Sequence, residues 1–128
     1  MGSKRVTITV MSGADDGRQF ELHEFPVTLG RHPDDDVFLP HDRRVSRHHA
    51  KMTRNGDSFF VEDVGAKGKG SINGTYLNGH KVNTKTSISG GDILLLGTVF
   101  LRFDKRDDII PDSPDNQSLQ RRGTTEEN

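Results

Sequence analysis

The sequence predicts an all-β protein, a β-sandwich assembled from many short strands. Apolar and polar residues alternate with period 2 in several short runs, and turn pairs that contain glycine separate these runs. No window sustains the i, i+3, i+4, i+7 pattern of an amphipathic helix. Because the strands of a sandwich use their side chains to form the core, we expect the loops at one end to carry the functional residues.

The first strand is predicted around Val6, Ile8 and Val10, which alternate with Thr7 and Thr9 in a run rich in β-branched residues. Further strands are predicted, in order, at residues 18–22, 26–30, 49–54, 58–62, 75–77, 93–96 and 99–103. Turn pairs between these runs are Asp16-Gly17, Asn55-Gly56, Asn78-Gly79 and Gly90-Gly91. Asn55-Gly56 is the clearest hairpin signal, because Asn-Gly supplies the positive φ values that a tight turn requires.

Length and composition indicate one domain without cysteine chemistry. The chain has 128 residues, no cysteine and a net charge of −1, which excludes disulfides, thiolate metal sites and cysteine nucleophiles. Its longest apolar run is residues 93–96, so we expect neither a membrane span nor a signal peptide, and a soluble, cytoplasmic protein. A net charge near zero predicts no whole-molecule attraction to nucleic acid or to a membrane.

Residues 104–128 are predicted to form a disordered acidic tail or linker after a folded unit at residues 4–103. This segment contains three apolar residues, and four Lys or Arg stand against seven Asp or Glu. So little apolar surface does not offset the entropy cost of ordering the chain. The folded domain is therefore expected to end near Phe103.

Three loops combine small residues with cations, hydroxyls or amides: residues 30–33, 43–49 and 65–75. Arg31 follows a predicted strand, Ser46 and Arg47 precede another, and Asn73 precedes a third. Arg presents a planar fork that matches phosphate oxygens, Ser donates a further hydrogen bond, and Asn both donates to and accepts from a peptide backbone. If these loops meet at one rim, they form an anion site that needs peptide contacts beyond phosphate to reach micromolar affinity.

These residues, in this order and spacing, resemble the forkhead-associated (FHA) family of phosphothreonine-peptide readers over about residues 6–103. The segments that carry the resemblance are Gly30-Arg31, Asp34-Asp35-Asp36 with Val37 and Leu39, Ser46-Arg47-His48-His49-Ala50, Phe60-Val61-Glu62-Asp63-Val64, Ser71-Ile72-Asn73-Gly74-Thr75-Tyr76-Leu77-Asn78-Gly79, Gly91-Asp92-Ile93 and Leu96-Gly97. A single segment of this kind would mean little, whereas the complete set is highly specific.

The resemblance implies an eleven-stranded β-sandwich of two antiparallel or mixed sheets, the FHA/SMAD-like fold. It implies that the loops bind a phosphothreonine-containing partner in Ser/Thr-kinase-dependent signalling, with a preference for phosphothreonine over phosphoserine. Arg31 and Ser46 would hold the phosphate oxygens. Arg47 would add a cationic contact, and Asn73 would fix the peptide main chain. The residues expected to support the structure of the site are Gly30, His49 and Gly74.

Two features depart from the family pattern. Ile72 stands where members usually carry Thr, so this position contributes only its backbone N–H to phosphate binding. About five additional residues, 66–70, lengthen the loop before Ser71 and carry Lys67 and Lys69. We expect these two lysines to supply auxiliary contacts to phosphate or to an acidic peptide.

Catalytic, metal and nucleotide sites have less support. Four histidines crowd one stretch: His32, His41, His48 and His49. Adjacent strand residues point to opposite faces, and no zinc-ligand spacing is present. Ser46 lacks the G-x-S-x-G context of a nucleophile elbow, and residues 65–71 lack the order of a phosphate-binding P-loop. We therefore predict a protein that is not an enzyme, without catalytic residues, metal or cofactor.

Two other functions and one regulatory hypothesis stay open. The alternative function is a phosphate-independent protein-interaction scaffold that uses a sheet face. Nucleic-acid binding through residues 43–47 has little support, because the net charge is near zero and the chain has one Tyr and no Trp.

Thr124 and Thr125 follow the basic pair Arg121-Arg122, so a phosphorylated tail would be able to bind its own domain or another copy. A plain solvated linker is the simpler interpretation of the tail.

Overall fold

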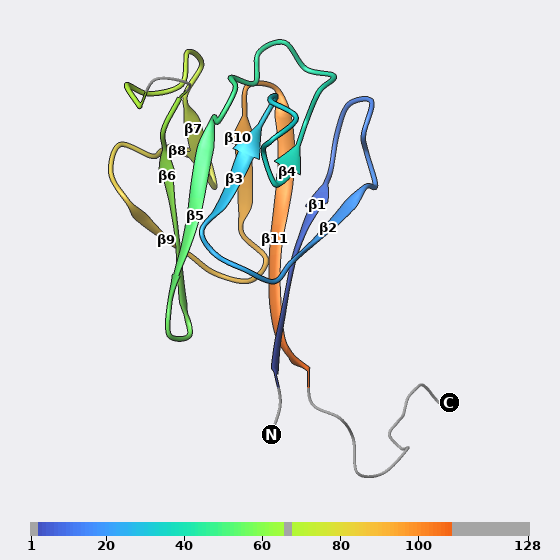
Figure 1. The fold of residues 1–128 in the computed structure, drawn as a ribbon, viewed down its shortest axis with the longest axis vertical. Helices are drawn as coiled ribbons and strands as arrows, with labels where there is room; N and C mark the ends of the chain where they lie inside the picture. Colours follow the sequence, from blue (N-terminus) through green and yellow to red (C-terminus); the bar gives the residue numbers. More distant parts are fainter. Residues whose placement is uncertain (1–2, 66–67, 109–128) are drawn as a thin grey trace.

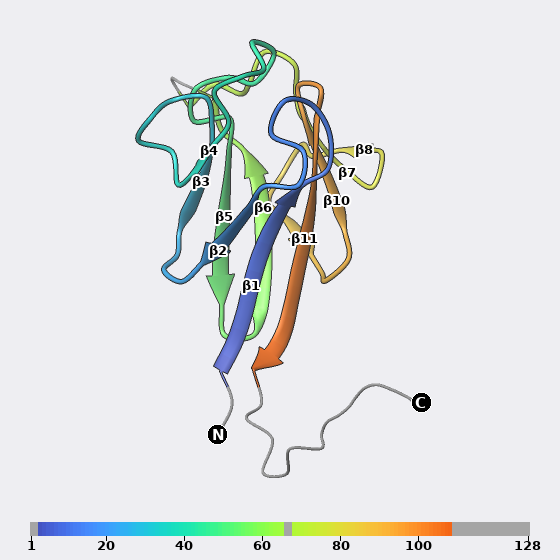
Figure 2. The ribbon, with the colours of Figure 1, turned by 90° about the vertical axis from the view of Figure 1, so that its right-hand side faces the viewer.

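The computed structural model describes residues 3–65 and 68–108, and these form two β-sheets that face each other (Figures 1 and 2). The strands are β1 (Ser3–Val10), β2 (Gln19–Leu22), β3 (Val27–Gly30), β4 (Val37–Phe38), β5 (Ala50–Asn55), β6 (Ser58–Asp63), β7 (Thr75–Leu77), β8 (His80–Lys81), β9 (Thr86–Ile88), β10 (Ile93–Leu96) and β11 (Val99–Asp108). The six-stranded sheet has the order β2-β1-β11-β10-β7-β8, and the five-stranded sheet has the order β4-β3-β5-β6-β9.

The predicted sandwich of eleven strands is confirmed. Among the described residues, the strand pairs of the six-stranded sheet are all antiparallel. The five-stranded sheet is mixed, because β4 pairs parallel to β3 while the other strands pair antiparallel. None of the described residues belongs to a helix able to cross a membrane.

One core fills the space between the sheets. Along β1, Val6, Ile8 and Val10 are fully buried, while the intervening Thr7 and Thr9 are half-buried, as the period-2 alternation predicts. The largest side chains at the centre are Phe59 from the five-stranded sheet and Phe103 from the six-stranded sheet, and their ring centroids are 5.5 Å apart. This core joins the two sheets, and therefore fixes the loops that connect strands of one sheet with strands of the other.

The hairpin between β5 and β6 forms as predicted, but its turn is shifted by one residue. Asn55 pairs with Ser58 in the strand ladder, so Gly56 and Asp57 occupy the turn, and Gly56 has a φ of +62°. A glycine at the first turn position is typical of a type II′ turn, which requires a positive φ at one central residue, whereas a type I′ turn requires it at both. In the β7–β8 hairpin, both Asn78 and Gly79 have positive φ, at +50° and +85°.

Strand β11 extends five residues beyond the predicted end of the folded unit at Phe103. Its last residues pair with the start of β1, in a register that runs from Thr7 opposite Asp104 to Ser3 opposite Asp108. Backbone hydrogen bonds order these residues although few of their side chains are apolar, and the Lys105 ammonium lies 5.2 Å from the centroid of the buried Phe59 ring. The rest of the predicted tail, residues 109–128, lies outside the described residues.

Three strands were not visible as alternating runs in the sequence: β4, β8 and β9. They span two, two and three residues. Alternation over two or three residues carries no periodic signal, so these strands depend on partners already in place, such as β3 for β4.

We predict that Phe59→Ala lowers the free energy of unfolding by about 3–5 kcal/mol, because it removes a ring from the centre of the core. Urea denaturation followed by circular dichroism measures the change. The matched control is Phe100→Ala, whose ring is 44% exposed and which we expect to cost about 1 kcal/mol or less. Equal losses for the two variants would contradict the position of Phe59 in the core.

Candidate anion-binding site

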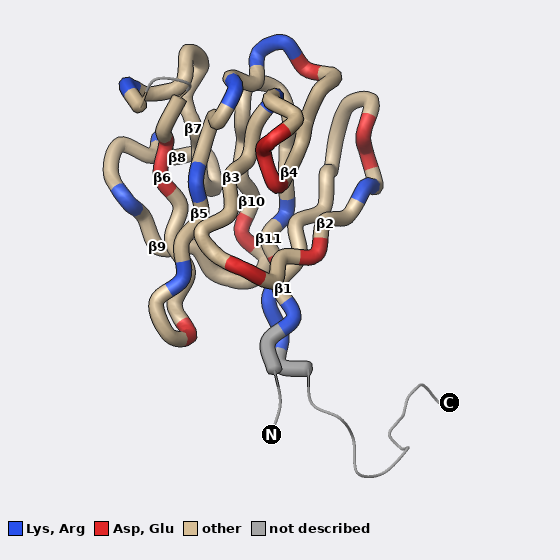
Figure 3. Tube along the Cα trace, in the orientation of Figure 1, with Lys and Arg blue, Asp and Glu red and all other residues tan. Residues whose placement is uncertain are grey.

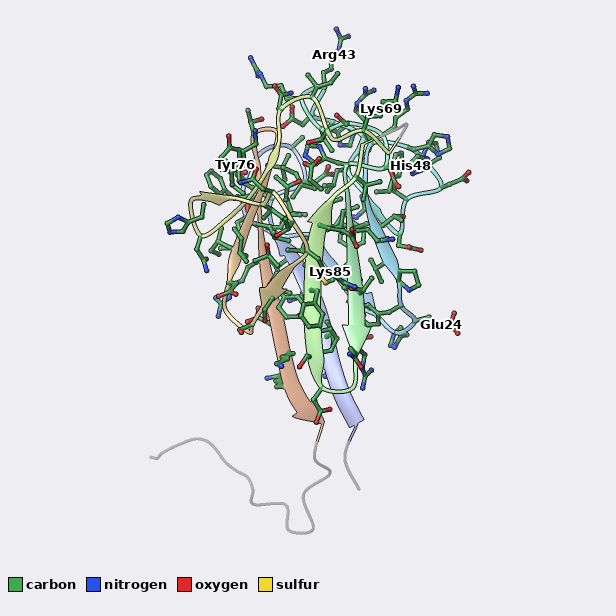
Figure 4. The ribbon with its side chains drawn as sticks, turned by 90° about the vertical axis from the view of Figure 1, so that its left-hand side faces the viewer. Glu24, Arg43, His48, Lys69, Tyr76 and Lys85 are labelled. Atoms are coloured by element: carbon green, nitrogen blue, oxygen red, sulfur yellow. The ribbon has the colours of Figure 1, made fainter. Side chains whose placement is uncertain are left out.

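Three loops meet at one end of the sandwich and enclose a pocket of about 340 Å³. They are the β3–β4 loop, the β4–β5 loop and the β6–β7 loop. Figure 4 shows Arg43 and Lys69 at this end of the molecule, away from Glu24 and Lys85. The residues that line the pocket are Arg31, Arg43, Arg44, Ser46, Arg47, Lys69, Gly70, Ile72 and Asn73.

Arg31 occupies the first position after β3 and is held there by the β4–β5 loop. Its backbone N–H donates to the carbonyl of Ser46 at 3.2 Å, and its Nε donates to the carbonyl of Val45 at 2.8 Å. Val45 is fully buried, so this second bond ties the Arg31 side chain to a fixed point of the fold. The two terminal guanidinium nitrogens make no hydrogen bond to the described residues, and are left for a ligand.

The Ser46 hydroxyl lies between the β4–β5 and β6–β7 loops. It accepts a hydrogen bond from the backbone N–H of Ile72 at 3.2 Å. A hydroxyl that accepts in this way keeps its own proton free to donate. The Ile72 N–H that is predicted to contact phosphate is therefore already bonded to the Ser46 hydroxyl. Ile72 itself is 91% exposed beside the pocket.

Asn73 joins the same two loops by a second bond. Its side-chain Nδ2 donates to the carbonyl of Arg44 at 2.9 Å. The amide oxygen and the second amide hydrogen have no partner among the described residues, so they can accept from and donate to a peptide main chain. Asn73 thus shapes the pocket in addition to the peptide contact expected of it.

His49 lies beneath the pocket and is fully buried. Its Nδ1 accepts from the backbone N–H of Ser46 at 2.9 Å, and its Nε2 donates to the carbonyl of Gly74 at 2.8 Å. Only the neutral Nε2–H tautomer satisfies both bonds. Burial lowers the pKa of His49, and this outweighs the opposing effects of the Gly74 carbonyl and the Asp63 charge.

Asp63, the last residue of β6, organises the loop that carries Ile72 and Asn73. Its carboxylate accepts from the backbone N–H and the hydroxyl of Ser71, and from the hydroxyl of Thr75 at 2.7 Å. The Ser71 hydroxyl in turn accepts from the N–H of Gly74 at 2.9 Å. Burial alone would raise the pKa of Asp63, but the hydrogen bonds from Ser71 and Thr75 lower it below its ordinary value, so the carboxylate stays ionised.

Gly30 leaves room for a buried carboxylate. A Cβ at this position would lie 2.4 Å from Oδ2 of Asp35 and 2.6 Å from the backbone nitrogen of His48. Asp35 accepts from the backbone N–H groups of His32 and His48, both at 3.0 Å, and from Nδ1 of His48 at 2.6 Å. Any side chain at position 30 would separate the β3–β4 loop from the β4–β5 loop.

Sequence reasoning missed the contribution of Arg43 and Arg44 to the pocket, because a basic pair in a loop is usually an ordinary solvated segment. Asp42 holds this pair in place by accepting from the N–H of Arg44 at 2.9 Å and from the N–H and hydroxyl of Thr98 in the β10–β11 turn. Lys69 lines the pocket, whereas Lys67 lies outside the described residues. Residues 3–65 and 68–108 contain no group of three potential metal ligands.

Comparison with known proteins supplies independent information about this chain. A family model described as FHA domain matches residues 27–97. Over 96 residues the chain is 42% identical to an oxoglutarate dehydrogenase inhibitor of Corynebacterium jeikeium, a match that covers 75% of this chain and 62% of the relative. Over 104 residues it is 39% identical to the glycogen accumulation regulator GarA of Mycolicibacterium smegmatis, covering 79% and 61%. The chain thus spans about six tenths of the length of these curated relatives.

The fold has close structural counterparts as well. One solved structure comes from a structural and functional analysis of phosphothreonine-dependent FHA domain interactions. It superposes on this chain with a TM-score of 0.67 at 28% identity, and the match covers 84% of this chain and 98% of that one.

We predict that acid weakens the fold through His49 in the range where an ordinary histidine titrates. Below the ordinary histidine pKa near 6.5, His49 binds a proton in the unfolded chain but stays neutral in the folded chain, where its pKa is lower. The free energy of unfolding therefore falls as the pH falls. Urea unfolding between about pH 7.5 and about pH 5.5 should show a loss of at most about 1.4 kcal/mol per pH unit from this one proton.

His49→Gln should remove this part of the pH dependence, whatever its own effect on stability. His80→Gln is the matched control, because His80 is exposed in β8. The explanation is wrong when His49→Gln and the natural chain lose the same stability over this pH range.

Proposed function

The chain belongs to the FHA domain family, and on that premise we propose that it is a phosphothreonine-peptide-binding interaction module in Ser/Thr-kinase-dependent regulation. The observation that carries the proposal is the convergence of the Arg31 guanidinium and the Ser46 hydroxyl on one pocket. Both groups are fixed by hydrogen bonds to the backbone that leave the terminal guanidinium nitrogens of Arg31 and the hydroxyl proton of Ser46 free. A fixed guanidinium beside a fixed hydroxyl suits the oxygens of a phosphate dianion.

The proposed phosphate site uses three side chains and one backbone N–H. Arg31 binds two phosphate oxygens through its terminal nitrogens, Ser46 donates to one of them, and Arg47 adds charge from the exposed side of the pocket. Each hydrogen bond to a charged group contributes about 1.5–3 kcal/mol. The Ile72 N–H, already directed at the Ser46 hydroxyl, is the proposed fourth donor.

The peptide around the phosphothreonine binds along the β6–β7 loop. Asn73 bonds its main chain with the amide atoms that the Arg44 carbonyl leaves free. Gly30, His49 and Gly74 support these contacts without touching the ligand, since His49 is fully buried and joins Ser46 to Gly74. The preference for phosphothreonine over phosphoserine is part of the proposal.

The proposed role is regulatory and non-enzymatic. The curated relatives carry the names of an inhibitor and a regulator, which supports a protein that acts by binding a phosphothreonine-containing partner. Nucleic acid, membranes and cofactors have no part in it, and the cytoplasm is its proposed setting. A phosphorylated Thr124 or Thr125 as an intramolecular ligand stays a prediction, because both lie outside the described residues.

We expect Arg31→Ala and Ser46→Ala each to weaken binding of a phosphothreonine peptide at least about tenfold, because each removes a bond to the phosphate. Isothermal titration calorimetry measures the affinity, with the peptide taken from an oriented phosphothreonine library. Arg54→Ala is the matched control, because Arg54 is an exposed arginine on β5 that does not line the pocket.

The same titrations test the alternative, a phosphate-independent scaffold that binds through a sheet face. That function predicts equal affinity for the phosphorylated and unphosphorylated peptides, and no effect of Arg31→Ala. Either result would contradict phosphothreonine recognition.

A further inference from the structure

The pocket holds more positive charge than one phosphate requires. Its lining includes five cations and no carboxylate. Figure 3 shows Lys and Arg positions in several loops at this end of the molecule, and others along the strands. The five cationic residues are Arg31, Arg43, Arg44, Arg47 and Lys69.

Two arginines on the six-stranded sheet form an ion pair with an acidic residue among the described residues, unlike the pocket cations. On the sheets, Arg5 pairs with Glu21 at 3.3 Å and Arg102 pairs with Asp104 at 3.2 Å. Within the described part of the chain, no ion pair joins any of the five pocket cations to an acidic residue. Arg44 interacts electrostatically with the Asp42 carboxylate, but the oxygens of that carboxylate already accept from Thr98 and from the Arg44 N–H. The counter-charge of the pocket is therefore left to its ligand.

The backbone that carries the arginine pair is also fixed in advance. The carbonyl of Arg44 accepts from Asn73, and a Cβ on Gly97 would lie 2.7 Å from that carbonyl group, so the β10–β11 turn packs directly against the loop. In the β6–β7 loop, the N–H of Gly70 donates to the carbonyl of Val64 at 2.7 Å, and this bond fixes the chain next to Lys69. A loop ordered before binding loses less entropy when a ligand arrives.

One phosphothreonine carries a charge of about −1.5 to −2 at neutral pH, so Arg31 and Arg47 are enough to balance it. Arg43, Arg44 and Lys69 then remain in the lining of the same pocket, without an ion pair to an acidic residue among the described residues. Positive charges held together without a counter-ion repel one another, and anionic groups of the ligand relieve that repulsion.

We infer that the natural ligand is a phosphothreonine segment with further negative charge within a few residues of the phosphothreonine. The charge comes from acidic side chains or from a second phosphoryl group, which share the anionic chemistry that these cations select. This inference rests on the proposed function and specifies the class of peptide that the site takes.

Four synthetic peptides on one neutral background test the inference. The first carries a single phosphothreonine, the second adds Glu on both sides of it, the third adds a second phosphothreonine, and the fourth has the Glu residues without phosphate. Fluorescence anisotropy in about 0.15 M salt gives the affinities. We expect the second peptide, the third or both to bind about tenfold more tightly than the first, and the fourth not to bind. Whichever peptide gains affinity identifies the source of the charge.

The triple variant Arg43→Gln, Arg44→Gln, Lys69→Gln should abolish this gain, which is measured within each variant as the ratio of its affinity for the second or third peptide to its affinity for the first peptide. The control variant Arg18→Gln, Arg54→Gln, Lys85→Gln removes the same charge from exposed residues outside the pocket, and should keep the gain. A gain that falls equally in both variants would assign the effect to overall charge and overturn the inference. Urea midpoints confirm that each variant is folded.

Failure of the inference and failure of the proposed function give different results. If the first peptide binds and the added anions change nothing, the inference is wrong and the proposed function stands. If no phosphorylated peptide binds more tightly than the fourth, the proposed function itself is wrong.

Discussion

The neutral, buried ring of His49 joins the β4–β5 loop to the β6–β7 loop, and the rest of the site depends on this junction. One ring nitrogen positions the backbone of Ser46 and the other positions that of Gly74, next to Asn73. The two loops come from residues far apart in the chain, so no local interaction would bring them together. A charged ring would lose the acceptor that holds Ser46, and the core beneath the loops keeps the ring neutral.

Three aspartates at the base of the loops also hold these loops in position. Asp35, Asp42 and Asp63 accept hydrogen bonds from backbone N–H groups or hydroxyls of the loops. Because these carboxylates are occupied in this way, they hold the loops without lining the pocket. The arginines above them form no ion pair with an acidic residue among the described residues, and the lining of the pocket contains cations and no carboxylate.

Much of the fold could be predicted from the sequence wherever apolar and polar residues alternate regularly. In β1, for example, Val6, Ile8 and Val10 face the core at every second position. Two-residue strands such as β4 have no period, so their positions were not predicted, and only the total of eleven strands followed from the family resemblance. The end of β11 was placed too early, because composition reports on apolar burial and not on a backbone ladder shared with β1. The shift of the β5–β6 turn by one residue followed from strand pairing that continues through Asn55.

The sequence by itself determined the sandwich class, the family and the kinds of donor available to an anion, because these follow from residue type, alternation and order. Tertiary structure alone decided that Arg43, Arg44 and Lys69 share a pocket with Arg31, and that the Ile72 N–H meets the Ser46 hydroxyl. Both arrangements join loops that lie tens of residues apart. Their juxtaposition is set by packing of the two sheets and by the hydrogen bonds of buried groups, neither of which has a local signature in the chain.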